Sequence, residues 1–343
     1  MKPYFTQDAT TLYQTTATRL PLADESVQCC VTSPPYWGLR DYGVDGQIGA
    51  EDLHDCLGWA TMRPCGACYV CHLVEAFREV RRTLAGDGVA WVNLGDCYAT
   101  TPPGNTKHGL EKWATSGLHG TITAAYAETL DSSVGQKRNT IAAGLKPKDL
   151  CLIPARVALA LQADGWWVRS DVIWHKEAIL PESVTDRPTK AHEYLFMLAK
   201  AERYYYDSDA VREPSVTDPA SKSAMMFGGR KRDSEDLAHS NEPGKSWEYT
   251  PTRNRRSVWT VNPRPYPGAH FATYPPELIE PCVLSGSRPG DTVLDPFNGS
   301  GTTGEVCRKW GRRYVGCDLN AEYLDLSIDR YRQALLFPVG GAA

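Results

Sequence analysis

The sequence predicts an α/β fold with a doubly wound, mostly parallel sheet. Short apolar runs are typical of buried strands, segments with helical spacing separate them, and one glycine-rich turn follows a strand and opens a helix. Strand-like runs at 166–174 and 193–199 lie close together in the chain, so we expect an antiparallel hairpin at the edge of the sheet. The 343 residues are enough for one large domain with insertions.

The predicted elements alternate between strand and helix. The first strand signal, around Leu12 and Tyr13, is weak, whereas residues 27–31 form an apolar, partly β-branched run that is typical of a buried strand. Later elements are expected as a helix at 73–84, a strand at 89–94, a helix at 154–163, the hairpin, a helix at 277–285, strands at 293–295 and 314–317, and a helix at 321–335. Stretches without a clear period interrupt them at 38–72, 98–148 and 207–268.

Composition limits the classes of protein. A formal net charge of −4 and a pI near 6.1 exclude a uniformly basic nucleic-acid binder, although a local basic face stays open. No apolar run approaches the roughly 20 residues that span a bilayer, and the start lacks the apolar core of a signal peptide, so we expect a cytoplasmic protein without a membrane partner. The 11 cysteines are then expected to be buried thiols or metal ligands rather than disulfides.

A stiff loop follows the strand at 27–31. Its residues Ser33, Pro34, Pro35 and Tyr36 should lie at the carboxyl end of that strand, where open α/β sheets bind ligands. The two prolines remove amide donors and leave carbonyls without a sheet partner. A serine hydroxyl, a free carbonyl and an aromatic ring together suit a flat ring that carries an amine. A rigid turn with a packed tyrosine is the alternative.

A second motif lies near the C-terminus. Gly299, Gly301 and Gly304 match the spacing G-x-G-x-x-G, follow a strand and open a helix, and Asp318 ends the next strand. This pattern predicts a nucleoside cofactor, because glycines let the backbone approach a ligand and the acid accepts hydrogen bonds from ribose hydroxyls. Nicotinamide dinucleotide and S-adenosylmethionine both fit. Asp295 favours the second, because a carboxylate suits a cationic amino-acid moiety and repels a pyrophosphate. A close helix–strand contact without a ligand is the structural alternative.

Together the two motifs resemble those of the β-group amino-DNA methyltransferases, in which the catalytic motif precedes the cofactor motif. Further segments are similar to family segments in family order: 93–96, 174–176, Arg187 with His192 and Glu193, and 270–275. The resemblance covers most of the chain except 38–72, 98–148 and 207–262. It implies a Rossmann-like methyltransferase domain with a catalytic half at 1–206, an inserted target-recognition region at 207–268, and an S-adenosylmethionine-binding half at 269–343.

The resemblance also implies roles for individual residues. Ser33, Pro34, Pro35 and Tyr36 would hold the target base. The residues implied to bind S-adenosylmethionine are Asp295, Pro296, Phe297, Gly299, Ser300, Gly301, Thr302, Thr303, Asp318, Phe271 and Thr273. Contacts to DNA are expected from Trp37, which would help Tyr36 to stack on the base, and from Arg230, Lys231, Arg232, Arg253, Arg255 and Arg256. Double-stranded DNA is the expected partner, a cognate restriction endonuclease is a further candidate, and monomer and homodimer both stay open.

The residue types suit transfer to an exocyclic amine. Its lone pair is delocalised into the base, so hydrogen bonds to the Ser33 hydroxyl and the Pro34 carbonyl would give the nitrogen tetrahedral character. The base must leave the duplex to reach them. Ser33 favours the N4 amine of cytosine within the family, with the N6 amine of adenine as the alternative. An NAD-dependent oxidoreductase and a catalytically inactive DNA-binding protein are more remote alternatives.

A group of cysteines lies where the resemblance lapses. Cys65, Cys68 and Cys71 have the spacing C-x2-C-x2-C, and Cys56 precedes them. Four thiolates suit a structural zinc ion. A zinc ribbon has two separated C-x2-C pairs, however, and here three cysteines form one run. Reduced thiols in a loop are therefore the alternative.

Overall fold

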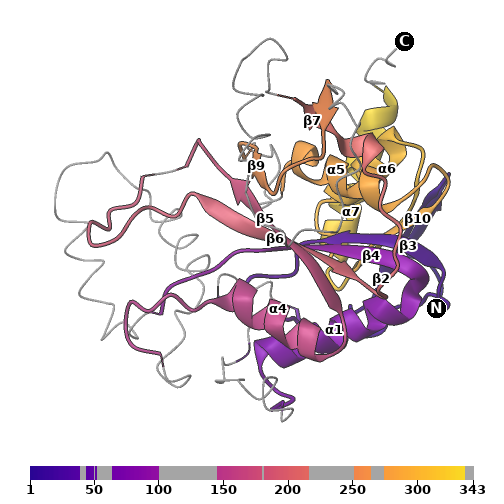
Figure 1. Ribbon diagram of the computed structural model, residues 1–343. Coiled ribbons are helices and arrows are strands. Elements are labelled where there is room, and N and C mark those ends of the chain that lie inside the picture. The colour runs from indigo at the N-terminus through magenta and orange to yellow at the C-terminus, as the bar shows by residue number, and fades with distance from the viewer. Residues whose placement is uncertain are drawn as a thin grey trace, which may run out of the picture.

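The protein folds around one mixed sheet, seen in a computed structural model (Figure 1). The structure describes residues 1–38, 44–49, 51, 64–99, 145–179, 181–215, 251–263 and 274–336. The strand order of the sheet is β1-β2-β11-β10-β3-β4-β6-β5-β9. The strands are β1 Phe5–Gln7, β2 Thr10–Gln14, β3 Val27–Thr32, β4 Leu84–Leu94, β5 Trp167–His175, β6 His192–Ala199, β9 Val258–Thr260, β10 Thr292–Asp295 and β11 Arg313–Asp318. The predicted α/β class, with a mostly parallel Rossmann-like sheet, is confirmed.

Helices cover both faces of the sheet, as the doubly wound fold requires (Figure 1). They are α1 Tyr69–Thr83, α4 Ile153–Ala163, α5 Pro276–Gly286, α6 Thr302–Lys309 and α7 Ala321–Leu336, with a short 3₁₀ helix at Asp209–Val211. One apolar cluster packs α1 and α4 against the sheet, and a second packs α5, α6 and α7 against the opposite face. None of the described helices is long and apolar enough to cross a membrane.

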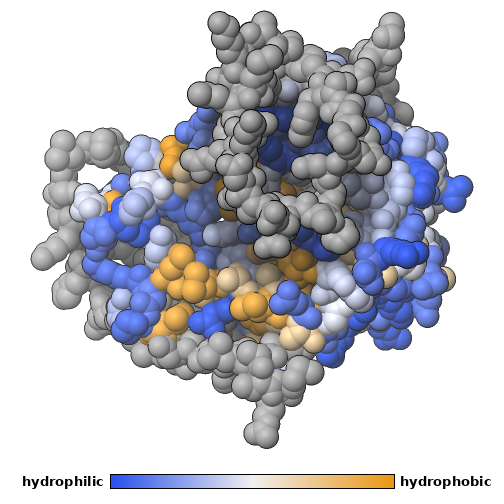
Figure 2. All heavy atoms as spheres, in the orientation of Figure 1, coloured by the Kyte–Doolittle hydropathy of each residue, from blue (hydrophilic) through white to orange (hydrophobic). Residues whose placement is uncertain are grey.

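Helix α1 begins earlier than its apolar period predicts. The expected start was residue 73, but the helix starts at Tyr69, after an extended Cys68. Tyr69, Val70 and Cys71 are buried in the same cluster as the rest of the apolar face, so the first turn is stabilised by tertiary packing. The other helix of this face, α4, is less completely covered, because Leu159 is 63% exposed. Figure 2 shows hydrophobic residues at the surface on this side of the molecule.

The predicted antiparallel hairpin forms, but it does not end the sheet. Strand β6 pairs antiparallel with both β4 and β5, and β9 continues the sheet as a parallel partner of β5. Strand β9 comes from the region expected to recognise the target, and its Trp259 is buried beside Trp91, with ring centroids 5.9 Å apart. The expectation of an edge hairpin is wrong in this respect, because a three-residue strand carries too little periodic signal to be found by sequence.

The sheet order decides where the two sequence motifs lie. Strand β3 is flanked by β4 and β10, and all three run parallel. The carboxyl ends of β3 and β10 therefore meet at the same edge, although the motifs that follow them are far apart in the chain. This edge is the expected ligand-binding side of an open α/β sheet.

Candidate active site

The two motifs are joined by direct hydrogen bonds. Thr32, the last residue of β3, donates from Oγ1 to Asp295 Oδ1 at 2.6 Å. The same carboxylate oxygen accepts the amide of Phe297 at 3.1 Å, and its Oδ2 lies 2.7 Å from Thr303 Oγ1 and 3.1 Å from the hydroxyl of Tyr274. Asp295 thus forms hydrogen bonds to the end of β3 just before the loop at residues 33–36, to the glycine-rich turn and to the segment before α5.

Asp295 was expected to face the cationic end of the cofactor. In the structure its side chain is 1% exposed, and its two oxygens are engaged by four donors. Burial raises the pKa of this carboxyl, and the hydrogen bonds from Thr32 and Thr303 oppose that rise. The residue lies beneath the wall of the site rather than in it.

One cavity of about 460 Å³ lies between the motifs. Ser33, Pro34, Pro35 and Tyr36 line one part of it. The glycine-rich turn lines another part through Pro296, Phe297, Gly299, Ser300 and Thr302, together with Asp318. The cavity has the size of an ordinary small-molecule site, and both predicted groups of residues reach it.

Asn93 contacts two residues of the loop at 33–36 through its side chain. Its Oδ1 accepts a long hydrogen bond of 3.4 Å from the Ser33 hydroxyl and lies 2.9 Å from the Tyr36 hydroxyl. Its Nδ2 donates to Glu193 Oε2 at 3.2 Å and to the Tyr194 carbonyl at 3.1 Å. When the Ser33 hydroxyl donates to Asn93, the oxygen of Ser33 keeps its lone pairs for a ligand.

Tyr36 is held by a partly buried charge pair. Its hydroxyl donates to Glu193 Oε2 at 2.6 Å, and the other oxygen of Glu193 is paired with Lys176. Burial, and then the charge of Glu193, raise the pKa of Tyr36 well above its usual value, so the phenol stays protonated. The ring also lies against Gly95, where an added Cβ would come within 2.5 Å of Tyr36 Cε2. This contact explains why a residue without a side chain occupies position 95.

The two proline carbonyls of the loop differ. Tyr69, in the first turn of α1, donates from its hydroxyl to the Pro35 carbonyl at 2.7 Å. The Pro34 carbonyl receives no hydrogen bond from any residue that the structure describes. Within the described part of the chain, the Pro34 carbonyl is therefore available to accept a hydrogen bond from a ligand.

Trp37 does not have the role expected from the sequence. Its side chain is 3% exposed and belongs to the apolar cluster under α1, and its Nε1 donates to the Glu51 carbonyl at 2.8 Å. A ring in this position cannot stack on a base in the cavity, so the expected DNA contact of Trp37 is wrong. Alternating burial in an irregular loop leaves no periodic signal from which this could have been predicted.

The glycine-rich turn is held from below by Asp318 and α7. Asp318 Oδ2 accepts the Gly299 amide at 2.8 Å, and its Oδ1 accepts the Asn320 amide at 2.9 Å. Burial raises the pKa of Asp318 to about 6, despite these two hydrogen bonds. The carboxylate lines the cavity and is placed to accept hydrogen bonds from a ligand.

The glycines of this turn are required for different reasons. Gly299 lines the cavity, whereas Gly301, at φ +76°, faces α7: a Cβ there would lie 2.5 Å from the Tyr331 hydroxyl. A Cβ on Gly304 would lie 2.1 Å from the same atom. Gly301 and Thr303 were both expected to touch the cofactor, but neither lines the cavity: Gly301 packs against α7, and Thr303 bonds to Asp295.

The described basic residues of the target-recognition region are partly neutralised. Arg253 and Arg256 both pair with Glu213 Oε1, at 2.8 and 2.7 Å. Glu213–Pro214 (β7) and Thr252–Arg253 (β8) form a small antiparallel ladder that brings these residues together. The Arg255 guanidinium lies 4.7 Å from the centre of the Trp259 ring. DNA binding by these arginines stays a prediction, and Glu213 is a partner that their sequence neighbourhood did not reveal.

Several predicted site residues lie outside the described part of the chain. They are Phe271 and Thr273 of the cofactor site, Arg230, Lys231 and Arg232 of the basic patch, and Cys56 of the cysteine group. The site also includes four residues for which no role was predicted: Asn93, Gly95, Lys176 and Glu193. Their signal was present, because all four stand in the short segments that carry the family resemblance.

A doubly wound sheet that brings the Ser33 to Tyr36 loop and a glycine-rich turn to one cavity is the arrangement expected of an amino-DNA methyltransferase. Comparison with known proteins agrees. A family model described as DNA methylase, for N6 and N4 enzymes, matches residues 27–329. The chain belongs to this family of N6/N4 DNA methylases.

Similar proteins are found over most of the chain. The type II methyltransferase M.Cfr9I of Citrobacter freundii is 45% identical over 91% of this chain and 83% of its own length. M.SmaI of Serratia marcescens is 44% identical over 90% of this chain and 85% of its own length. Among solved structures, the PvuII DNA methyltransferase, described as cytosine-N4-specific, matches with a TM-score of 0.58 at 16% identity, covering 96% of this chain and 89% of that chain. The structural match supports the same fold.

Proposed function

We propose that this protein transfers a methyl group from S-adenosylmethionine to the exocyclic N4 amine of a cytosine that is flipped out of double-stranded DNA. One observation carries the proposal: a single cavity of about 460 Å³ is lined both by the Ser33 to Tyr36 loop and by the glycine-rich turn with Asp318. A base held by the first and a cofactor held by the second would lie within reach of each other, which is the main requirement of a direct transfer.

The residues present fit S-adenosylmethionine. Asp318 offers a carboxylate to ribose hydroxyls, Phe297 offers an aromatic ring, and Gly299 leaves the wall of the cavity open. When bound, this cofactor supplies a methyl group on a positively charged sulfur. The chain itself provides binding, orientation and exclusion of water, and the described part of the site needs no nucleophilic cysteine.

The catalytic loop prepares the amine. Ser33 Oγ, with its proton directed to Asn93, accepts one amine hydrogen, and the free Pro34 carbonyl accepts the other. These bonds draw the nitrogen out of conjugation with the ring and leave its lone pair free to attack. As the nitrogen gains the methyl group, it loses one of its two protons to solvent. The Tyr36 ring, fixed by Glu193 and Gly95, provides the surface on which the flipped base stacks.

The choice of cytosine rests on Ser33. In the family that this chain resembles, serine at this position is more usual in N4-cytosine enzymes, whereas aspartate or asparagine is more usual in N6-adenine enzymes. Methylation of adenine N6 is the second candidate, because a hydroxyl and a carbonyl accept an amine of either base.

Analysis of the methylated nucleoside tests the proposal. The purified protein is incubated with unmethylated plasmid DNA and S-adenosylmethionine, and the DNA is digested to nucleosides for chromatography and mass spectrometry. We expect N4-methyldeoxycytidine. N6-methyldeoxyadenosine would overturn the choice of base, and DNA without any methylated nucleoside would overturn the enzymatic function. Sequencing of the same DNA identifies the recognition site.

Cofactor binding should depend on pH through Asp318. Its pKa is raised to about 6, so the carboxylate is ionised at pH 7 and mostly protonated at pH 5. Protonation removes an acceptor for the ribose, and affinity for S-adenosylmethionine should fall about tenfold from pH 7 to pH 5 if only the ionised form binds. Isothermal titration calorimetry at each pH measures this change.

The variant Asp318→Asn provides the control. It keeps the size of the side chain and does not titrate, so its weaker binding should be nearly independent of pH over the same range. An identical pH dependence in the variant and the wild type would show that another group is responsible.

A further inference from the structure

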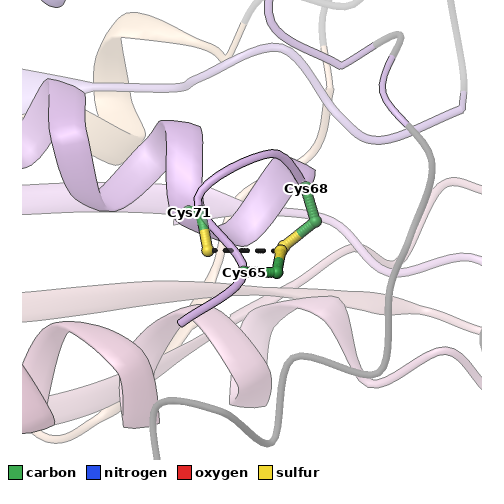
Figure 3. Close-up of side chains that lie close together, drawn as sticks. All are labelled: Cys65, Cys68 and Cys71. Atoms are coloured by element: carbon green, nitrogen blue, oxygen red, sulfur yellow. Dashed lines mark hydrogen bonds between the residues drawn. The ribbon is translucent and has the colours of Figure 1, made fainter. Parts of the chain in front are cut away.

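Three cysteines converge at the start of α1, away from the catalytic cavity. The Sγ atoms of Cys65, Cys68 and Cys71 all lie within 4.8 Å of one another, and those of Cys65 and Cys71 are 3.7 Å apart (Figure 3). This is too long for a disulfide. In a tetrahedral zinc site with bonds of about 2.3 Å, thiolate sulfurs are about 3.8 Å apart, which the Cys65–Cys71 distance matches. The other two sulfur pairs lie no more than 4.8 Å apart.

Two features of the surroundings favour thiolates, although burial raises the pKa of the Cys68 thiol. Cys68 precedes the first turn of α1 and Cys71 lies in it, where the helix dipole favours negative charge. The amide of Gly66 donates to Cys71 Sγ at 3.3 Å, a contact that is stronger when the sulfur is charged. Cys68 and Cys71 are buried, while Cys65 is exposed, which leaves a path for an ion to enter. Soft thiolate ligands select zinc over magnesium or calcium.

The same helical turn supports the catalytic loop at two points. Tyr69, between the cysteines, donates to the Pro35 carbonyl at 2.7 Å. His72 Nδ1 lies 2.7 Å from Glu51 Oε1, and the Glu51 carbonyl accepts the indole of Trp37. Residues 68–72 therefore contact both Pro35 and Glu51. A ligand that holds residues 68–72 in place would also restrain these two residues.

We propose that Cys65, Cys68 and Cys71 bind a zinc ion as thiolates, and that the ion fixes the first turn of α1 against the catalytic loop. Each thiol that binds releases its proton to solvent, and no redox change occurs. The site is structural, because its ligands do not line the cavity. Cys56, expected from the sequence as a fourth ligand, lies outside the described residues, so the proposal rests on the other three.

Metal content tests the site without any measure of methyl transfer. The full chain is expressed with zinc, dialysed, and analysed by inductively coupled plasma mass spectrometry. We expect about one zinc per chain in the wild type. Cys65→Ser and Cys68→Ser should lose most of it, and Cys97→Ser, which changes a cysteine outside the cluster, should keep it. A wild type without zinc, or serine variants that retain it, would overturn the proposal.

Cobalt provides a measurement that does not depend on the variants folding. Co²⁺ added to the chelator-treated wild type should produce the intense visible bands of a tetrahedral thiolate site, and zinc should remove them. A pale, octahedral spectrum would count against the site.

Hydrogen exchange then tests the link to the loop: chelation should increase exchange of the amides of residues 36–38 and 69–72 several-fold in the wild type. Unchanged exchange would overturn the structural role.

Discussion

Replacing Ser33 by alanine should slow methyl transfer by about 100-fold or more, since it removes one of two acceptors that act on the amine as the transfer occurs. Affinity for S-adenosylmethionine should stay nearly unchanged, because the Ser33 hydroxyl bonds to Asn93 and is not expected to contact the cofactor. Single-turnover transfer of a labelled methyl group to DNA, together with calorimetric titration of the cofactor, separates the two effects.

Ser26→Ala is the matched control. Ser26 is exposed, lies just before β3 at the end remote from the cavity, and bonds only to the Ala23 carbonyl. It should transfer methyl groups at the wild-type rate. Wild-type transfer by Ser33→Ala would remove the serine from the mechanism, and an equal loss of cofactor affinity would mean that the substitution had disturbed the whole site.

Replacing Asp295 by alanine should lower the free energy of unfolding by about 3 kcal/mol or more, because four hydrogen bonds to one buried carboxylate are lost at once. Urea denaturation followed by circular dichroism measures the loss. Thr32, Tyr274 and Thr303 would all be affected, so the variant should also bind S-adenosylmethionine poorly even though the carboxylate does not line the cavity.

Two further variants make this result interpretable. Asp329→Ala removes an exposed carboxylate paired only with the next turn of its helix, and should change stability by less than about 0.5 kcal/mol. Thr32→Val removes one donor and leaves the carboxylate with three, so its loss of stability should be smaller than that of Asp295→Ala. A loss for Asp295→Ala no greater than for the surface control would refute the role of this residue as a buried junction.

Much of the fold was predictable because its signals are local. Strands β3, β10 and β11 are short apolar runs, α1 and α4 have helical apolar spacing, and each observed boundary is within a few residues of the expected one. Strand β4 is one exception, because it starts at Leu84 rather than at the expected residue 89, and the start of α1 is another. Its first turn depends on burial of Tyr69 and Val70 against other elements, and no local pattern encodes that packing.

The candidate site was predictable to the level of its motifs. Ser33 to Tyr36 and the turn at 296–302 carry distinctive residue types, and strand order places both at one edge of the sheet. The partners of those residues were less accessible. Glu193 holds Tyr36 from a strand 157 positions away, and Glu213 neutralises arginines 40 and 43 positions away, so only a folded chain reveals either contact.

By itself, the sequence determined the class of fold, the family, and the two motifs that line the cavity, because strands, helices and ligand loops have local signatures. Only the tertiary structure decided what each side chain faces. It buried Trp37 and Asp295, turned Gly301 towards α7, and gathered Cys65, Cys68 and Cys71 around one point. The physical reason is that burial and hydrogen bonding are set by neighbours brought in from distant strands, and these contacts leave no periodic trace in the chain.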